Sequence, residues 1–100
     1  MSGPHTVSIT SNGDHELMKV PPNKTGITVQ VLGDADGGTC TLGMLNPADG
    51  SVNAVLQDDS LQVLTVGQAR KFLCGGETTP YLTVAGGGGS LDLTAVVSSL

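Results

Sequence analysis

Apolar and polar residues alternate along most of this chain with a period of two residues. The clearest example is Gly26–Leu32, where the aliphatic Ile27, Val29 and Val31 alternate with Thr28 and Gln30. The segment Ser90–Ser98 repeats the pattern, and its second face carries Asp92, Thr94 and Val96. Successive side chains of a β-strand point to opposite faces of the sheet. This period therefore predicts strands that are buried on one face only.

Segments of this kind recur at intervals of roughly eight to twelve residues, separated by Gly, Pro, Asn and Asp, as in sandwiches and jelly rolls. The segments predicted to be strands are 6–10, 16–20, 26–32, 39–45, 52–56, 61–66, 69–74, 81–85 and 90–98. We predict an all-β fold, a small antiparallel β-sandwich or jelly roll of about eight strands. It forms a single domain over residues 1–100, in which 1–5 are a flexible N-terminal arm.

The turn residues predict which neighbouring strands form hairpins. The acidic, glycine-containing run 33–38 favours a hairpin between 26–32 and 39–45. The run Gly86–Gly89 followed by Ser90 is also the sequence of a common flexible linker. Because a patterned segment follows it, we interpret it as the tip of a terminal hairpin between 81–85 and 90–98.

Composition supports the β assignment and predicts a thin core. The apolar fraction is 38%, but the aromatic fraction is only 2%. Phe72 and Tyr81 are the aromatic residues, and both occupy strand positions that suit a core. The β-branched and small residues that dominate the chain fit a pleated, half-buried surface.

The charge balance argues against two classes of partner. The formal net charge is −5, with nine acidic residues against four Lys and Arg. Nucleic-acid binding depends on Lys and Arg that neutralise phosphates, and an anionic membrane surface would repel this chain. We therefore expect no nucleic-acid partner and no membrane association. The basic pair Arg70–Lys71 is interpreted as a solvated strand end or turn.

The N-terminal segment and the cysteines suggest a cytoplasmic site of synthesis. The residues after Met1 lack the charged and apolar regions of a secretory signal. Cys40 and Cys74 are expected to be buried, free thiols, because disulfides are rare in the cytosol. In an oxidising compartment the two could pair with each other.

No arrangement of residues indicates catalysis or a cofactor. His5 and His15 are the available bases, and both are expected to be exposed beside a terminus and a turn. We predict that the protein is not an enzyme and holds no cofactor and no metal. Calcium stays open as an alternative, because carboxylates gather at the predicted tips. These tip residues are Asp34, Asp36, Asp49, Asp58 and Asp59.

The order of strands and turns resembles that of small β-sandwich or jelly-roll virion proteins of tailed bacteriophages. In that group a strand, a Gly-Gly-Thr turn, a strand with an early Leu, an Asp-Gly tip, a short strand and a last hairpin with a glycine-rich tip follow one another. The matching stretches here are Gly26–Leu32, Gly37–Leu42, Asn46–Gly50, Tyr81–Gly86 and Ser90–Leu93. The resemblance implies a head decoration (cement) protein or a head–tail accessory protein, with no catalytic residues.

The resemblance implies that the partner is the major capsid protein or another virion protein. It also implies that this protein is located in the virion. It also implies a homo-oligomer, with a trimer favoured. Our candidates for the contact surface are the N-terminal arm and the outer face of the last strand. These candidate residues are Ser2, Gly3, Pro4, His5, Thr6, Asp92, Thr94 and Val96. A generic Ig-like protein-binding module and a carbohydrate-binding module are the alternatives.

Overall fold

The computed structural model describes residues 4–57 and 60–100, and within them the regular structure is entirely β. Most of the alternating segments form strands, as the period-two pattern predicts. The strands are β1 (His5–Ile9), β2 (Gly13–Glu16), β3 (Gly26–Asp34), β4 (Thr39–Leu45), β5 (Val52–Ala54), β6 (Leu56–Gln57), β7 (Ser60–Leu61), β8 (Val63–Leu64), β9 (Ala69–Leu73), β10 (Pro80–Ala85) and β11 (Asp92–Ser99).

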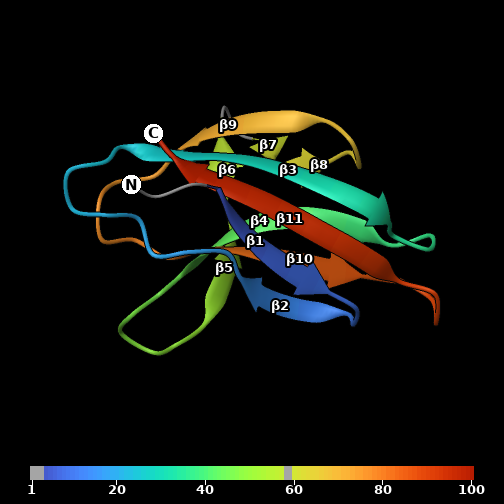
Figure 1. Ribbon diagram of the computed structural model, residues 1–100. Coiled ribbons are helices and arrows are strands. Elements are labelled where there is room, and N and C mark those ends of the chain that lie inside the picture. The colour runs from blue at the N-terminus through green and yellow to red at the C-terminus, as the bar shows by residue number, and fades with distance from the viewer. Residues whose placement is uncertain (1–3, 58–59) are drawn as a thin grey trace.

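All strands except β6 and β7 form two antiparallel layers (Figure 1), and those two strands pair with each other in a small separate sheet. Sheet A has the order β1-β11-β3-β9, and sheet B has the order β2-β10-β4-β5, with β8 also paired to β4. The pairing is nested along the chain: β1 pairs with β11, β2 with β10, β3 with β9, and β4 with β8. A long antiparallel ribbon folded over on itself in this way is a jelly roll. The predicted fold class is confirmed.

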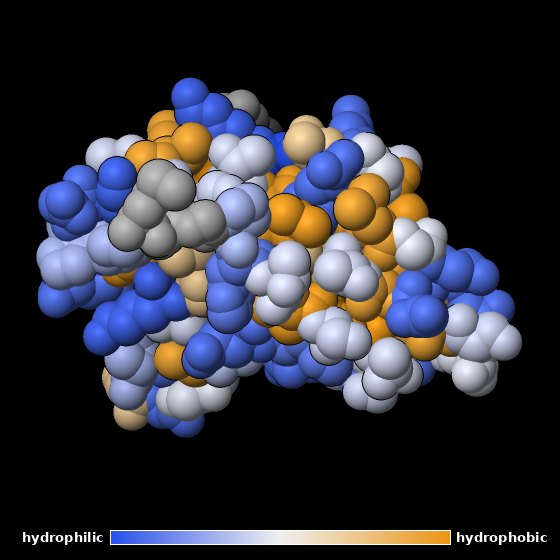
Figure 2. Space-filling view, viewed as in Figure 1, coloured by the Kyte–Doolittle hydropathy of each residue, from blue (hydrophilic) through white to orange (hydrophobic). Residues whose placement is uncertain are grey.

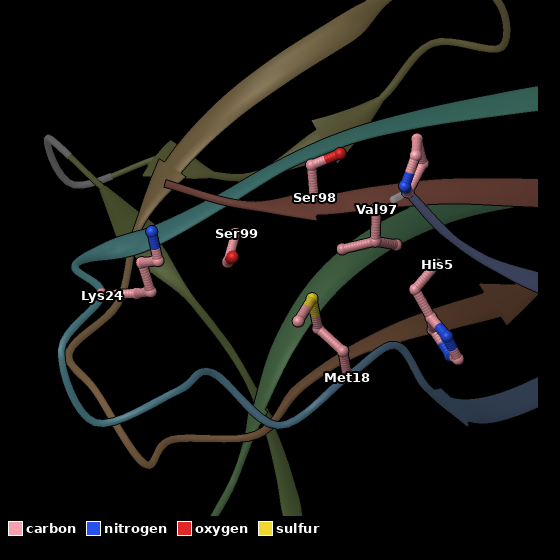
Figure 3. A pocket seen from close by; sticks show the side chains of 7 residues that line it. His5, Met18, Lys24, Val97, Ser98 and Ser99 are labelled. Carbon is pink, nitrogen blue, oxygen red and sulfur yellow. The ribbon is translucent and has the colours of Figure 1, made fainter. Parts of the chain in front are cut away.

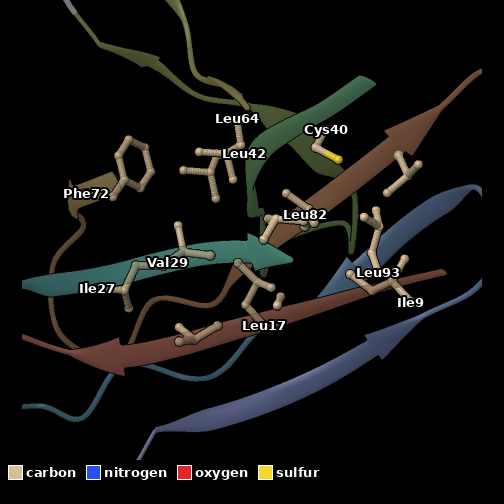
Figure 4. Packing of buried hydrophobic residues seen from close by; sticks show 14 of the residues in the cluster. Ile9, Leu17, Ile27, Val29, Cys40, Leu42, Leu64, Phe72, Leu82 and Leu93 are labelled. Carbon is tan, nitrogen blue, oxygen red and sulfur yellow. The ribbon is translucent and has the colours of Figure 1, made fainter. Parts of the chain in front are cut away.

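Inward side chains of β1, β3, β4, β8, β9, β10 and β11 supply most of the core between the sheets (Figure 4). On β3, Ile27, Val29 and Val31 are fully buried, as the alternation predicts. On β11, Leu93, Ala95 and Val97 are also fully buried. Burying one such aliphatic side chain contributes about 1.5–3 kcal/mol. Phe72 joins them from β9 as the largest fully buried side chain.

Two residues contradict the sequence interpretation of their strands. Tyr81 lies on the outward side of β10 and is half-buried, because its neighbours Pro80 and Leu82 take the inward positions. Arg70 is half-buried rather than solvated, and its guanidinium donates a 2.8 Å hydrogen bond to Oε1 of Gln62. Alternation along each strand accounts for both positions. Arg70 points inward because it is in register with the buried Val29, and Tyr81 points outward between two inward residues.

The second strand begins earlier than predicted. β2 covers Gly13–Glu16, whereas 17–20 is not a strand. In this segment Leu17 and Val20 are buried, and their amides donate to the carbonyls of Pro80 and Thr78. Their spacing of three residues does not fit a strand, so single hydrogen bonds fix the segment instead.

Both predicted hairpins are wrong, because their turns connect the two sheets. β3 lies in sheet A and β4 in sheet B, and β10 lies in sheet B while β11 lies in sheet A. The turn residues mark correctly where the chain reverses, but they carry no information about the partner of each strand. That partner is set by burial of the apolar face against residues far away in the sequence.

The sheet-to-sheet loops at one end of the sandwich bind one another. Asn12 donates to the Gly87 carbonyl at 2.9 Å, and its Oδ1 accepts from the Gly87 amide at 2.8 Å. Oδ2 of Asp36 accepts from the Ser90 amide at 2.9 Å, and the Asp36 carbonyl accepts from the Gly88 amide at 3.0 Å. We call these residues the corner cluster.

The corner cluster explains the glycine run. A Cβ at Gly88 would overlap the Asp36 carboxylate, and one at Gly87 would lie 3.0 Å from Oδ1 of Asn12. Gly86 has a φ of 76°, in the left-handed region that favours glycine. Backbone conformation therefore favours glycine at Gly86, and close approach of the loops favours it at Gly87 and Gly88.

Both cysteines are buried free thiols. Cys40 points inward from β4 with 2% of its surface exposed, and Cys74 follows β9 with 7% exposed. Desolvation by burial raises the pKa of both thiols, and a hydrogen bond with Thr78 partly offsets the rise in the pKa of Cys74. The expectation of free thiols is confirmed.

Replacing Asn12 with Ala is expected to lower the free energy of unfolding by about 1–2 kcal/mol, because two hydrogen bonds to Gly87 are lost. Denaturant unfolding checks this value. Asn53→Ala is the matched control, since Asn53 is exposed and makes one long 3.4 Å bond to Ser51. Equal stability of the two variants would contradict the structural role of the corner cluster.

The native protein is expected to react very slowly with an aromatic disulfide reagent, because thiolate formation is disfavoured and access is blocked at both cysteines. In denaturant both thiols should react at the rate of a free cysteine. Rapid modification of either thiol in the folded state would show that its burial is wrong.

Candidate functional site

Apart from Asp34 and Asp92 at one end, the outward side chains of β1, β11 and β3 in sheet A are uncharged. Strand register fixes their rows: Thr6 lies beside Val96, which lies beside Gln30. In the next row Ser8, Thr94 and Leu32 lie side by side across β1, β11 and β3. We call these outward residues of β1, β11 and β3 the sheet A face. Figure 2 shows neutral and apolar side chains gathered over the middle of the molecule, with strongly hydrophilic residues toward its two ends.

The structure brings together part of the contact surface predicted from the sequence. Asp92, Thr94 and Val96 point outward on β11, as expected, and Thr6 of β1 is the direct neighbour of Val96. Pro4 and His5 are both exposed, but His5 begins β1, opposite Val97, instead of belonging to a flexible arm. Strand pairing across the whole of β1 is the physical reason for this correction. Ser2 and Gly3 lie outside the described residues.

The hydroxyl groups of the sheet A face are available for a partner. In the part of the chain that the structure describes, the side chains of Thr6, Ser8 and Thr94 make no hydrogen bond to protein. Leu32 adds an apolar side chain that is 41% exposed. Protein interfaces are depleted of charge at their centres, so this composition suits burial against another protein.

The outer face of sheet B differs, because its polar side chains pair with one another. The Thr83 hydroxyl donates to Oδ1 of Asp14 at 2.6 Å. The Tyr81 hydroxyl lies 3.5 Å from Oε1 of Glu16. These groups already have partners, so the sheet A face is the better candidate for binding.

A groove of about 450 Å³ opens beside the start of β1 and the end of β11 (Figure 3). Met18 and Val97 supply its apolar floor, with His5 toward one end and Lys24 and Ser99 toward the other. Pro4 and Ser98 complete its lining. The groove therefore combines an apolar floor with hydrogen-bond donors and one ammonium group.

Sequence reasoning missed two residues of these surfaces for different reasons. Leu32 points outward because Val31, the residue before it, is buried. The alternation in the sequence was therefore sufficient to predict this position. Lys24 lies between β2 and β3, outside any strand. Only the path of that connection brings Lys24 beside Ser99, and no sequence signal could have indicated it.

Carboxylates at two of the acidic tips accept hydrogen bonds from residues of their own loops. Oδ1 of Asp34 accepts from the Asp36 amide at 2.8 Å, and Oδ1 of Asp49 accepts from the Ser51 amide and hydroxyl. The bonds from Ser51 lower the pKa of Asp49. Within 4–57 and 60–100, no three His, Cys, Asp or Glu side chains are grouped so as to hold a metal ion. Asp58 and Asp59 lie outside the described residues.

His15 is half-buried on β2, and its Nε2 lies 2.8 Å from the Ser11 carbonyl oxygen. The expectation of full exposure is therefore wrong for His15 and right for His5. Among the described residues, no helix is long and apolar enough to cross a membrane.

Comparison with known proteins rests on the fold. No protein-family model matches the chain, and no curated protein matches it in sequence. The crystal structure of the SPBc2 prophage-derived protein YomS is similar, with a TM-score of 0.55 at 16% sequence identity. The alignment covers 98% of this chain and 97% of that chain. At this identity the match shows that the two proteins share a fold over their whole length.

Proposed function

We propose that this chain is a non-enzymatic structural protein of a bacteriophage virion, and specifically a capsid decoration (cement) protein. The observation that carries the proposal is the full-length match in fold to a prophage-derived protein. The order of strands and turns in the sequence supports the same class. Its location is then the virion, and its partner is the major capsid protein or another virion protein.

The sheet A face supports binding to a protein lattice. Its central rows are made of hydroxyl, amide and aliphatic groups, and Leu32 is exposed among them. A decoration protein that binds the assembled lattice but not its free subunits stabilises the assembled form by mass action. We place the sheet A face against the outer surface of the head, and we expect the protein to act as a homo-oligomer, with a trimer favoured.

A carbohydrate-binding role is less well supported. Sugar-binding platforms use exposed aromatic rings, whereas Phe72 is 2% exposed. Tyr81 is half-buried on sheet B, so a single aromatic ring is available.

The proposal predicts saturable binding of the purified protein to phage heads that were assembled without it. The heads come from the phage or prophage whose genome carries this gene, and co-sedimentation measures the binding. Thr94→Arg is expected to weaken binding at least about tenfold, because it puts an unpaired charge at the centre of the contact.

Thr39→Arg is the matched control. Thr39 is an exposed threonine on an inner strand of sheet B, in register with Ala85, so the same change alters the opposite face. It should bind heads as the unmodified chain does. Absence of binding to heads by the unmodified chain would refute the proposed function, and equal losses in both variants would refute the assignment to sheet A.

A further inference from the structure

The groove is suited to a negatively charged occupant. Lys24 is the formally charged residue in its lining, and no Asp or Glu contributes to it. Within the described part of the chain, the side chains of His5, Lys24 and Ser99 have no hydrogen-bond or ion-pair partner. In a chain with nine acidic residues and four Lys and Arg, this local excess of donors and positive charge stands out. A carboxylate above the apolar floor would meet several of these donors at once.

Two carboxylates face each other at the opposite end of the same strand. Asp92 of β11 and Asp34 of β3 are direct cross-strand partners, and both are exposed. Like charges opposite each other destabilise a sheet, so a cation from outside would relieve this pair. The side chain of Asp92 has no hydrogen-bond partner among the described residues.

The two ends are separated by the length of β11, which runs from Asp92 to the groove residue Ser99 (Figure 1). One copy of the protein therefore carries an acidic end and a groove with a lysine at its other end. The groove of one molecule can accept the acidic end of a second molecule, and the acidic end of the first stays available for a third. Contacts of this type are heterologous, and they close into a ring or continue as a filament according to the rotation between copies.

We infer that copies of this chain associate head to tail, with the Asp34–Asp92 pair of one copy bound at the Lys24 groove of the next. This inference rests on the homo-oligomer in the proposed function and names the contact that forms it. The sheet A face between the two ends stays free for the capsid. Charge complementarity identifies the occupant of the groove as a second copy of the chain.

Charge reversal tests the contact, with mass measured by light scattering and sedimentation over a range of concentrations. The unmodified chain should exceed the 10.0 kDa of one chain and dissociate as salt is raised to about 1 M, where screening is strong. Lys24→Glu and Asp92→Lys should each weaken association at least about tenfold. The variant with both changes should associate again, because the two charges are exchanged.

Lys71→Glu is the control, since it makes the same change in net charge on β9, outside the groove. It should assemble as the unmodified chain does, and thermal melting shows whether each variant folds. A monomeric unmodified chain, single variants that assemble normally, or a monomeric double variant would overturn the inference. If the chain assembles head to tail but does not bind heads, only the proposed function fails. If it binds heads as a monomer, only this inference fails.

Discussion

One layer of small aliphatic side chains lies between the two sheets, and the rest of the structure depends on it. Its members come from alternate positions of strands that are distant in sequence, such as Ile9 on β1 and its register partner Leu93 on β11. Because the side chains are small, the sheets must be aligned closely for the layer to exclude water. The nested pairing provides this alignment, since each strand of the first half has its partner in the second half.

The same alternation that fills the core determines what each face offers to a partner. Burial of Val31 forces Leu32 outward, and burial of Leu93 and Ala95 forces Thr94 outward. Sheet A thereby presents hydroxyl and aliphatic groups, whereas Asp14 and Thr83 on sheet B bind each other. The outer faces of the two sheets differ because cross-strand neighbours on sheet B include a hydroxyl beside a carboxylate, which can bond to each other.

The sequence was sufficient for the strands and their faces because both depend on local alternation. It was insufficient for the pairing, because the turn sequence at 33–38 is the same whether the two flanking strands share a sheet or lie in different sheets. The two halves of the predicted contact surface, Thr6 and Val96, were chosen separately, and only the β1–β11 register shows that they touch. The groove beside Lys24 forms from three segments, so its position depends on the complete fold.

Pairing of the first strand with the last has a consequence for synthesis on the ribosome. β1 leaves the exit tunnel early, but its partner β11 (Asp92–Ser99) is made much later. Until then Ile9 has no sheet A neighbour to cover it. Loop closure over such a separation is slow compared with closure of a local hairpin. Low aromatic content and a net negative charge both oppose aggregation of the nascent chain until β11 has been made.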